Sequence, residues 1–366
     1  MATVLLLGGV GFIGRNLVAY LLSQGVPPAN IRVVDKVLPA TAWLNDAHKA
    51  AIEKVEFRQP NLVSPASIER AFARDDGAKW DYVINLAAET KYSQSDSVYE
   101  EKVFVLSVNC AKEAAKQKCK VYVEVSTGQV YDGDKKSSDE NAKIKPWTGI
   151  AKAKAKAEEE IKKIPDLNLI IVRPAIVYGP GDMQGITPRL IIGHIYKHLK
   201  EEMKFLWTKD LRINTVHVED VCRALWALCE YYKDKEAKGE VFNLVDKQDT
   251  DQETINRHIR SIFGIQTGFQ GSIISQFAKL NLESVTEEVN DTHMAPWSDL
   301  LKASNITNSP LTPYLDQELL YNNSLSMDGT KIEKAIGFSY SIPEVTEQHI
   351  RDIVDGYKKQ GIWPSD

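Results

Sequence analysis

The chain has 366 residues, 43% of them hydrophobic, and a formal net charge of −5. This size and hydrophobic content allow a large buried core, arranged as two domains or as one large α/β domain with an appendage. The acidic balance supplies no electrostatic surface for nucleic acid or for an anionic membrane. No apolar run reaches membrane-spanning length and the first predicted strand begins at Thr3, so we expect a cytoplasmic protein without a signal peptide.

The four cysteines show neither a CxxC pair nor histidine neighbours at metal-ligand spacing. We therefore expect Cys110, Cys119, Cys222 and Cys229 to be reduced packing residues, and we expect no metal site. The lysines of KAKAKAEEEIKK recur with glutamates at helical spacing, which predicts a solvated helix face rather than a basic patch.

The first segment, TVLLLGGVGFIG, combines an apolar run, a glycine-rich turn and the start of a helical pattern. The apolar run predicts a short buried strand. In a strand–turn–helix unit of this kind, backbone N–H groups of the turn and the helix N-terminus face a pyrophosphate. The segment therefore predicts a dinucleotide site, with cofactor contacts from Gly8, Gly11, Phe12, Ile13 and Gly14.

A second apolar strand, IRVVD, ends in Asp35, about 20 residues after the last glycine, where the dinucleotide fingerprint requires a carboxylate. A carboxylate there accepts a hydrogen bond from the adenosine ribose 2′-OH and repels a 2′-phosphate. The sequence thus favours NAD over NADP. Lys36 would soften that repulsion, unless it is a solvated surface charge.

Strands and helices then alternate up to about residue 178. The pattern predicts a strand over KVEFRQ, a helix capped by Ser64 over SPASIERAFAR, a strand over DYVINLAAE and a long helix to about Lys118. A strand over VYVEVST, the helix around AKAKAKAEEEIKK and a strand over LNLIIVRPAIVY follow. This alternation predicts βαβ units and a parallel sheet.

The pattern loosens past Tyr178, and from about Thr250 the chain is mixed and rich in turn signals. We therefore predict an α/β fold: a Rossmann doubly wound parallel sheet with a smaller, discontinuous C-terminal substrate domain. The NAD-binding domain is expected over residues 1–178 and 213–248, and the substrate-binding cap over residues 179–212 and 249–366. Ligands of open parallel sheets bind where such a cap faces the carboxyl ends of the strands.

Several motifs, taken in order, resemble the extended short-chain dehydrogenase/reductase family of the NAD-dependent epimerase/dehydratase type. The similarity covers about the first two thirds of the chain. It rests on GGVGFIG, Asp35, Asn61-Leu62, NLAAET, STGQVYD, RPAIVYGPGD and INTVHVEDVCRA. The resemblance implies that NAD is the cofactor and that Asn61, Leu62, Ala87 and Pro174 join its binding site.

In that family a Ser or Thr hydroxyl polarises the reacting oxygen, a Tyr acts as acid/base, and a Lys lowers the Tyr pKa and holds the nicotinamide ribose. The resemblance assigns the hydroxyl to Thr127 and the amine to Lys154. The tyrosine position, four residues before Lys154, is Ile150, which cannot carry a proton. Removing a positioned general acid/base costs on the order of 10²–10⁴ in rate, so this departure decides the functional question.

Three tyrosines are candidates for a relocated base, namely Tyr92, Tyr131 and Tyr178, and each is otherwise a packed aromatic. Helical spacing turns Lys152 and Lys156 away from the face that carries Lys154.

Other positions have roles that only the resemblance implies. It places Arg173, Pro174 and residues 178–181 beside the nicotinamide, and His217 between the two domains, where a buried structural histidine is expected. It also places Glu89, Thr90 and Lys91 on a loop that lines the substrate pocket.

Two functions remain open at this point. One is an NAD-dependent enzyme acting on a hydroxyl or carbonyl of a small, polar substrate such as a nucleotide sugar, supported by Thr127 and Lys154. The other is a catalytically silent NAD-binding sensor or assembly subunit, supported by Ile150. By analogy with the family we also expect a homodimer, formed through the helices predicted at about 103–118 and 149–163.

Overall fold

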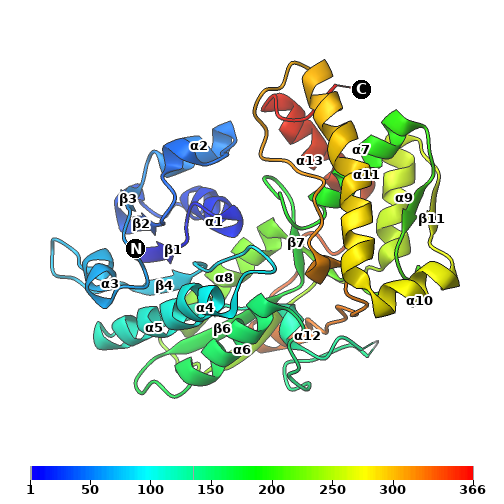
Figure 1. Cartoon of the computed structure of the whole chain (residues 1–366). Coiled ribbons are helices and arrows are strands. Elements are labelled where there is room, and N and C mark those ends of the chain that lie inside the picture. Colours follow the sequence, from blue (N-terminus) through cyan, green and yellow to red (C-terminus); the bar gives the residue numbers. More distant parts are fainter. Residues whose placement is uncertain (1, 135, 366) are drawn as a thin grey trace.

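The computed structural model describes residues 2–134 and 136–365, and its centre is a seven-stranded sheet (Figure 1). All neighbouring strands in it run parallel, in the order β10-β6-β5-β4-β1-β2-β3. The order reverses direction at β1, which makes the carboxyl ends of β1 and β4 the switch point of a Rossmann sheet. The strands are β1 (Val4–Leu7), β2 (Ile31–Val34), β3 (Glu56–Arg58), β4 (Tyr82–Asn85), β5 (Val121–Val125), β6 (Leu169–Pro174) and β10 (Glu240–Leu244).

Helices cover both faces of this sheet, as the period of two along β1 shows. Val4 and Leu6 pack into one core together with residues of α1 and α8, whereas Leu5 and Leu7 pack into another with residues of α3, α5 and α6. Strands buried on both faces are mostly apolar, which is why the central strands could be predicted from the sequence. The predicted α/β doubly wound fold is confirmed. The helices are α1 (Phe12–Ser23), α2 (Asp46–Ile52), α3 (Pro65–Phe72), α4 (Asp96–Tyr99), α5 (Leu106–Lys116), α6 (Gly149–Ile161) and α8 (Val218–Tyr232).

Two local expectations are wrong. The strand predicted over LNLIIVRPAIVY breaks at Ala175, because β7 (Ile176–Tyr178) leaves the sheet and pairs with β9 (Thr215–His217). Ser64 does occupy the N-cap position of α3, but its side chain makes no capping hydrogen bond; Pro65, which lacks an N–H, follows it.

A second set of helices forms the cap, which lies beside the carboxyl edge of the sheet (Figure 1). These helices enclose a separate hydrophobic core that includes Leu190, Ile259, Trp297 and Tyr357. The elements are α7 (Thr187–Leu199), β8 (Met203–Phe205), α9 (Gln252–Phe263), β11 (Thr267–Phe269), α10 (Ser272–Leu280), α11 (Leu282–Ala303) and α13 (Glu347–Lys359).

One segment of the C-terminal third returns to the sheet. Helix α12 (Thr330–Ile336) contributes Ile332 to the core beneath α8 and β10, and Leu325 and Tyr340 join the same core. The chain therefore passes between the sheet and the cap more often than the predicted domain boundaries imply. The domain boundaries themselves stay a prediction.

Two further features of the fold concern its cysteines and the length of its apolar helices. All four cysteines are free thiols, three of them buried and Cys119 half-buried, as expected for packing residues. In residues 2–134 and 136–365, no helix combines the length and apolarity needed to cross a bilayer.

Candidate functional site

A large cavity of about 1160 Å³ lies between the carboxyl edge of the sheet and the cap. Its sheet side, called here the cofactor half, is formed by the β1–α1 turn, the loops after β4, β5 and β6, and the start of α6. Its other side, called the cap half, is formed by α7, β8, α10, α11 and residues 315–325. Of the residues predicted from the sequence, the cavity is lined by Gly8, Gly11, Phe12, Ile13, Gly14, Thr127, Lys154 and Pro174.

The glycine turn is shaped by close backbone approaches. Gly8 has φ of +80°, and a Cβ there would lie 2.6 Å from the backbone nitrogen of Ala87. A Cβ on Gly14 would lie 2.5 Å from Gly9 Cα. Helix α1 begins after Gly11 with no side-chain cap, so its first N–H groups have no intrahelical acceptor and face the cavity. This is the geometry that binds a pyrophosphate.

Four predicted cofactor residues lie outside the lining of this cavity. Asp35 follows β2, and its two carboxylate oxygens accept from the backbone N–H groups of Val10 and Val37, both at 3.0 Å. Asn61 is exposed beyond β3, Leu62 is buried in the core, and Ala87 packs beneath Gly8. Asp35 thus braces the glycine turn; its predicted ribose contact stays a prediction.

Thr127 and Lys154 both line the cofactor half. The Thr127 hydroxyl oxygen accepts from the Gln129 backbone N–H at 3.2 Å, which leaves its own proton available to a substrate oxygen. Lys154 is buried, and its ammonium donates to Glu124 Oε1 at 3.0 Å and to the Val125 carbonyl at 2.8 Å. A third N–H remains for a ligand, since an ammonium has three.

Glu124 is the centre of a buried polar network. Its side chain is fully buried, and it also accepts from Asn85 at 2.7 Å, Ser107 at 2.8 Å and Tyr122 at 3.0 Å. These donors compensate the burial of the carboxylate, which fixes the Lys154 ammonium at the floor of the cofactor half. The sequence analysis missed Glu124, although a glutamate inside an otherwise apolar strand was a visible signal.

Comparison with known proteins agrees with this geometry. A family model described as the NAD dependent epimerase/dehydratase family matches residues 4–244. This chain belongs to that family. NAD is the family's cofactor, and the uncapped α1 terminus and the glycine cradle that a Cβ would fill both fit its pyrophosphate.

Individual relatives are distant. The dTDP-D-glucose 4,6-dehydratase of Dictyostelium discoideum is 30% identical over 208 residues, which are 51% of this chain and 47% of that protein. The decarboxylating sterol-4-alpha-carboxylate 3-dehydrogenase of Candida albicans is 28% identical over 229 residues, 60% of this chain and 64% of the enzyme. The matched region thus spans about half of the first relative and just under two thirds of the second.

Solved structures are similar over the whole chain. A double mutant of DesIV, the dTDP-glucose 4,6-dehydratase of Streptomyces venezuelae, has a TM-score of 0.68 at 19% identity and covers 98% of both chains. UDP-glucose 4-epimerase from Thermotoga maritima has a TM-score of 0.66 at 20% identity, covering 98% of this chain and 99% of the epimerase. At these identities the likeness establishes the fold.

At the position where the resemblance implies a tyrosine, the chain has Ile150. Ile150 lies in the first turn of α6, one turn before Lys154, and both line the cavity. Its side chain packs against a small buried cluster formed by Tyr99, Val103 and Ala153. An apolar side chain therefore lies one helical turn from the buried amine; that this is the position of the family tyrosine stays a prediction.

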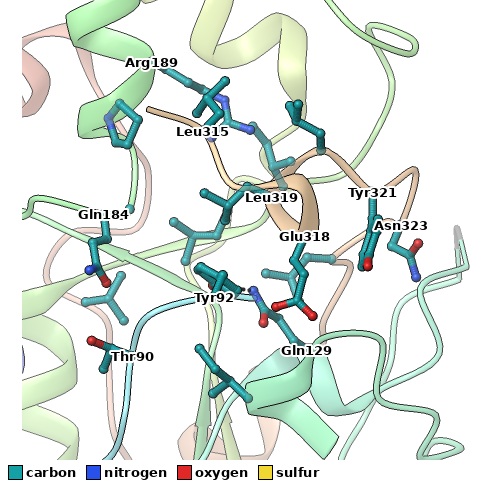
Figure 2. Close-up of a pocket in the computed structure, with 18 of the residues that line it drawn as sticks. Thr90, Tyr92, Gln129, Gln184, Arg189, Leu315, Glu318, Leu319, Tyr321 and Asn323 are labelled. Carbon is teal, nitrogen blue, oxygen red and sulfur yellow. Dashed lines mark hydrogen bonds between the residues drawn. The ribbon is translucent and has the colours of Figure 1, made fainter. Parts of the chain in front are cut away.

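Polar groups surround this apolar position. The Tyr92 hydroxyl accepts from Gln129 Nε2 at 3.1 Å, and Gln129 Oε1 accepts from the Thr148 hydroxyl, the N-cap of α6, at 2.9 Å. Glu318 comes from the C-terminal third, and its carboxylate accepts from the Gly149 N–H at 2.8 Å. Figure 2 shows Tyr92, Gln129 and Glu318 converging on the cavity. Sequence reasoning missed Gln129 and Glu318.

The other two candidate tyrosines do not reach the cavity. Tyr131 is buried, and its hydroxyl donates to Asn243 at 2.7 Å and accepts from Arg173 at 2.8 Å. Tyr178 is fully buried, and its hydroxyl donates to the Glu344 carbonyl at 3.4 Å. Burial raises the pKa of both phenols, that of Tyr131 to about 12. Neither can serve as a relocated base.

Arg173, expected near the nicotinamide, and His217, expected between the two domains, are both buried in structural contacts. Arg173 is buried in an ion pair with Glu158, which also accepts from Ser126. His217 is buried, contacts the ring of Tyr178, and accepts the Glu219 N–H at the start of α8 through Nδ1. Burial lowers the pKa of His217 to about 4, so it is a neutral packing group, as expected.

The loop after β4 lies only in part where the resemblance implied, whereas the lysines of α6 face outward as expected. Glu89 and Thr90 line the cavity, whereas Lys91 is exposed and lies outside the lining. Lys152 and Lys156 are exposed on the outer face of α6.

Proposed function

We propose that the protein is an NAD-dependent oxidoreductase of the epimerase/dehydratase type, acting on a hydroxyl or carbonyl of a small molecule. The observation that carries this proposal is the convergence of the glycine turn, Thr127 and Lys154 on one cavity that continues into the cap. NAD supplies a hydride acceptor when oxidised and a hydride donor when reduced. The substrate carbon loses or gains that hydride while its oxygen loses or gains a proton.

Thr127 and Tyr92 take the roles of orienting and protonating the substrate oxygen. The Thr127 hydroxyl donates a hydrogen bond to it, because its own lone pair is already held by the Gln129 N–H. Tyr92 is the one candidate tyrosine on the cavity wall, and its oxygen is oriented by the Gln129 amide. Lys154, held by Glu124, offers its remaining N–H to the cofactor ribose.

The pH dependence distinguishes this arrangement from the usual Tyr–Lys pair. Burial raises the pKa of Tyr92, with smaller contributions from the nearby carboxylates of Glu318 and Asp316. Tyr92 is therefore a protonated acid at neutral pH, suited to carbonyl reduction and slow as a base. We expect alcohol oxidation to accelerate about tenfold per pH unit up to at least pH 9, and Tyr92→Phe to remove that slope. A rate independent of pH between 7 and 9 would contradict the role of Tyr92.

Nucleotide sugars are the polar substrates to test first. The Dictyostelium relative is named for dTDP-D-glucose, and a solved neighbour of this fold carries UDP-glucose. Turnover is measured by nicotinamide absorbance with NAD and each substrate, and by product analysis, because an epimerase regenerates its cofactor. Thr127→Val, which preserves shape and removes the hydroxyl, should lower kcat while leaving NAD affinity unchanged.

A second function has its own supporting observation. Ile150 removes the acid/base group, and Lys154 is committed to Glu124, so the site also suits a catalytically silent NAD-binding sensor or assembly subunit. Such a protein would bind NAD with no turnover in either direction, and Tyr92→Phe would change nothing.

The oligomeric state and location follow as proposals. We propose a homodimer through α5 and α6, which lie side by side on one face of the sheet (Figure 1). Light scattering at micromolar concentration tests it, and a monomer would contradict it. We also propose that the protein works in the cytosol, in keeping with its free thiols.

A further inference from the structure

The cap half of the cavity has mostly apolar walls. They come from the strand β8, the facing helices α10 and α11, and the segment near Leu315. The apolar side chains include Phe205, Trp207, Ile274, Phe277, Val289 and Leu315. A chamber of this kind gains affinity by removing apolar ligand surface from water.

Among the described residues, two polar side chains that line this chamber have neither a hydrogen-bond partner nor an ion-pair partner. The Arg189 guanidinium, in the first turn of α7, has no hydrogen-bond acceptor and no ion-pair partner among the described residues. His293 on α11 is only 4% exposed, and neither of its ring nitrogens has a partner in that part of the chain. Leaving a buried polar group such as the His293 ring unpaired costs about 1–3 kcal/mol, so its retention on a cavity wall points to a ligand. Arg189 is half-buried on the same wall and adds an available cation.

The charge of the chamber favours one negative group rather than two. Glu288 and Glu318 also line the cap half, and Lys204, its other cation, is paired with Glu202 at 3.4 Å. A diphosphate would meet one unpaired cation and two carboxylates. A single carboxylate could form a bidentate ion pair with the Arg189 guanidinium.

The chamber borders an apolar surface. Ile273 and Phe277 of α10 line the cavity and are nevertheless 83% and 51% exposed, and Leu280 on the same helix is 88% exposed. Helix α10 lies at the outer edge of the cap (Figure 1). An apolar molecule that extends out of the chamber would remain in contact with this face.

We propose that the substrate is an amphipathic acid: an apolar body within the chamber beside α10, a carboxylate on Arg189, and the reacting hydroxyl or carbonyl at Thr127. This inference rests on the proposed function and names its substrate class. His293 supplies a hydrogen bond to a further substrate oxygen. The proposed substrate class is consistent with the name of the Candida relative, which refers to a sterol carboxylate. The proposal itself is argued from the residues of this chain.

Calorimetry on the full chain saturated with NAD tests the proposal with three probes: laurate, dodecan-1-ol and UDP-glucose. The alcohol matches laurate in chain length and lacks its charge. We expect laurate to bind at least roughly tenfold more tightly than dodecan-1-ol, and UDP-glucose to bind more weakly than laurate. Arg189→Gln should abolish the preference for laurate, whereas Arg257→Gln, an exposed arginine on α9 away from the cavity, should preserve it.

A second variant measures the contribution of apolar contacts to ligand affinity. Phe277→Ser should weaken laurate and dodecan-1-ol by the same factor, because it removes apolar contact and no charge. Equal binding of laurate and dodecan-1-ol to the unmodified protein would overturn the proposal, as would UDP-glucose binding more tightly than laurate. Both results leave NAD binding intact, so they are distinguishable from failure of the proposed function, which would appear as no NAD binding or no hydride transfer.

Discussion

The two halves of the cavity recognise their ligands by different means. The cofactor half is built from backbone: glycines that permit close approach, a helix terminus without a cap, and charged side chains already paired, such as Lys154 with Glu124. The cap half is built from side chains of distant segments, and within residues 2–134 and 136–365 Arg189 and His293 have no hydrogen-bond or ion-pair partner. On the proposed assignment, a preformed cofactor site adjoins a second site whose polar groups are left for a ligand, and substrate can change there without a change of fold.

Ile150 belongs to the cofactor half, at the start of α6, and replacing it has the largest expected effect. Ile150→Tyr would place a phenol one helical turn from Lys154, and restoring a general acid/base is worth on the order of 10²–10⁴ in rate. The measurement is single-turnover hydride transfer. Ile150→Phe provides the matched ring without a hydroxyl and should show no gain. Equal rates for the two variants would show that the missing phenol does not limit the site.

Gly14→Ala tests the backbone character of the cofactor half. The new Cβ would meet Gly9 Cα at 2.5 Å and the Gly8 carbonyl oxygen at 2.6 Å, and backbone atoms cannot move aside without reshaping the turn. We expect NAD affinity in calorimetry to fall on the order of 100-fold. Gly356→Ala, in helix α13 where a Cβ meets nothing within 4 Å, is the control and should bind NAD normally. Unchanged affinity in the first variant would refute the pyrophosphate role of the turn.

His293→Phe tests whether a residue of the cap half lowers the stability of the fold while contributing to ligand binding. Replacing an unpaired buried imidazole with an apolar ring should raise the free energy of unfolding by about 1–2 kcal/mol at pH 7 and weaken laurate binding. Burial lowers the pKa of His293 to about 4, so below pH 6.5 the unfolded chain binds a proton that the folded chain does not. The wild type therefore loses stability as the pH falls from 6.5 toward 4, and its deficit relative to the variant should widen. Denaturant titrations at pH 7 and pH 5 measure the stability difference between wild type and variant and its change with pH. A variant less stable than the wild type would argue for a packing role of His293.

Asp35→Ala has the smallest expected effect. It removes the carboxylate that favours an unmodified ribose, and should flatten the preference for NAD over NADP by about tenfold. Because Asp35 also accepts the Val10 N–H, part of any loss in NAD affinity reflects a looser turn. Asp75→Ala, at a fully exposed carboxylate, is the control for net charge. Equal affinities of the wild type for NAD and NADP would remove the discriminating role from Asp35.

Prediction from sequence succeeded where chemistry is local. Gly8 and Gly14 are required by contacts within a few residues of the turn or with the adjacent strand, and the spacing from Lys154 identified Ile150 without any structure. It failed at Tyr131 and Tyr178, because the hydrogen-bond partners that bury them, Asn243 and the Glu344 carbonyl, lie far along the chain.

By itself the sequence determined the doubly wound sheet and the NAD-dependent family, and it placed Ile150 one helical turn before Lys154, since period, glycine spacing and helical offset are short-range properties. Only the tertiary structure decided which tyrosine reaches the cavity, that Glu124 holds Lys154, and that Glu318 meets the start of α6. It also decided that Arg189 and His293, 104 positions apart, line one apolar chamber. Burial and hydrogen-bond pairing of these side chains depend on segments that come into contact only after folding. No periodicity in the sequence encodes such long-range contacts.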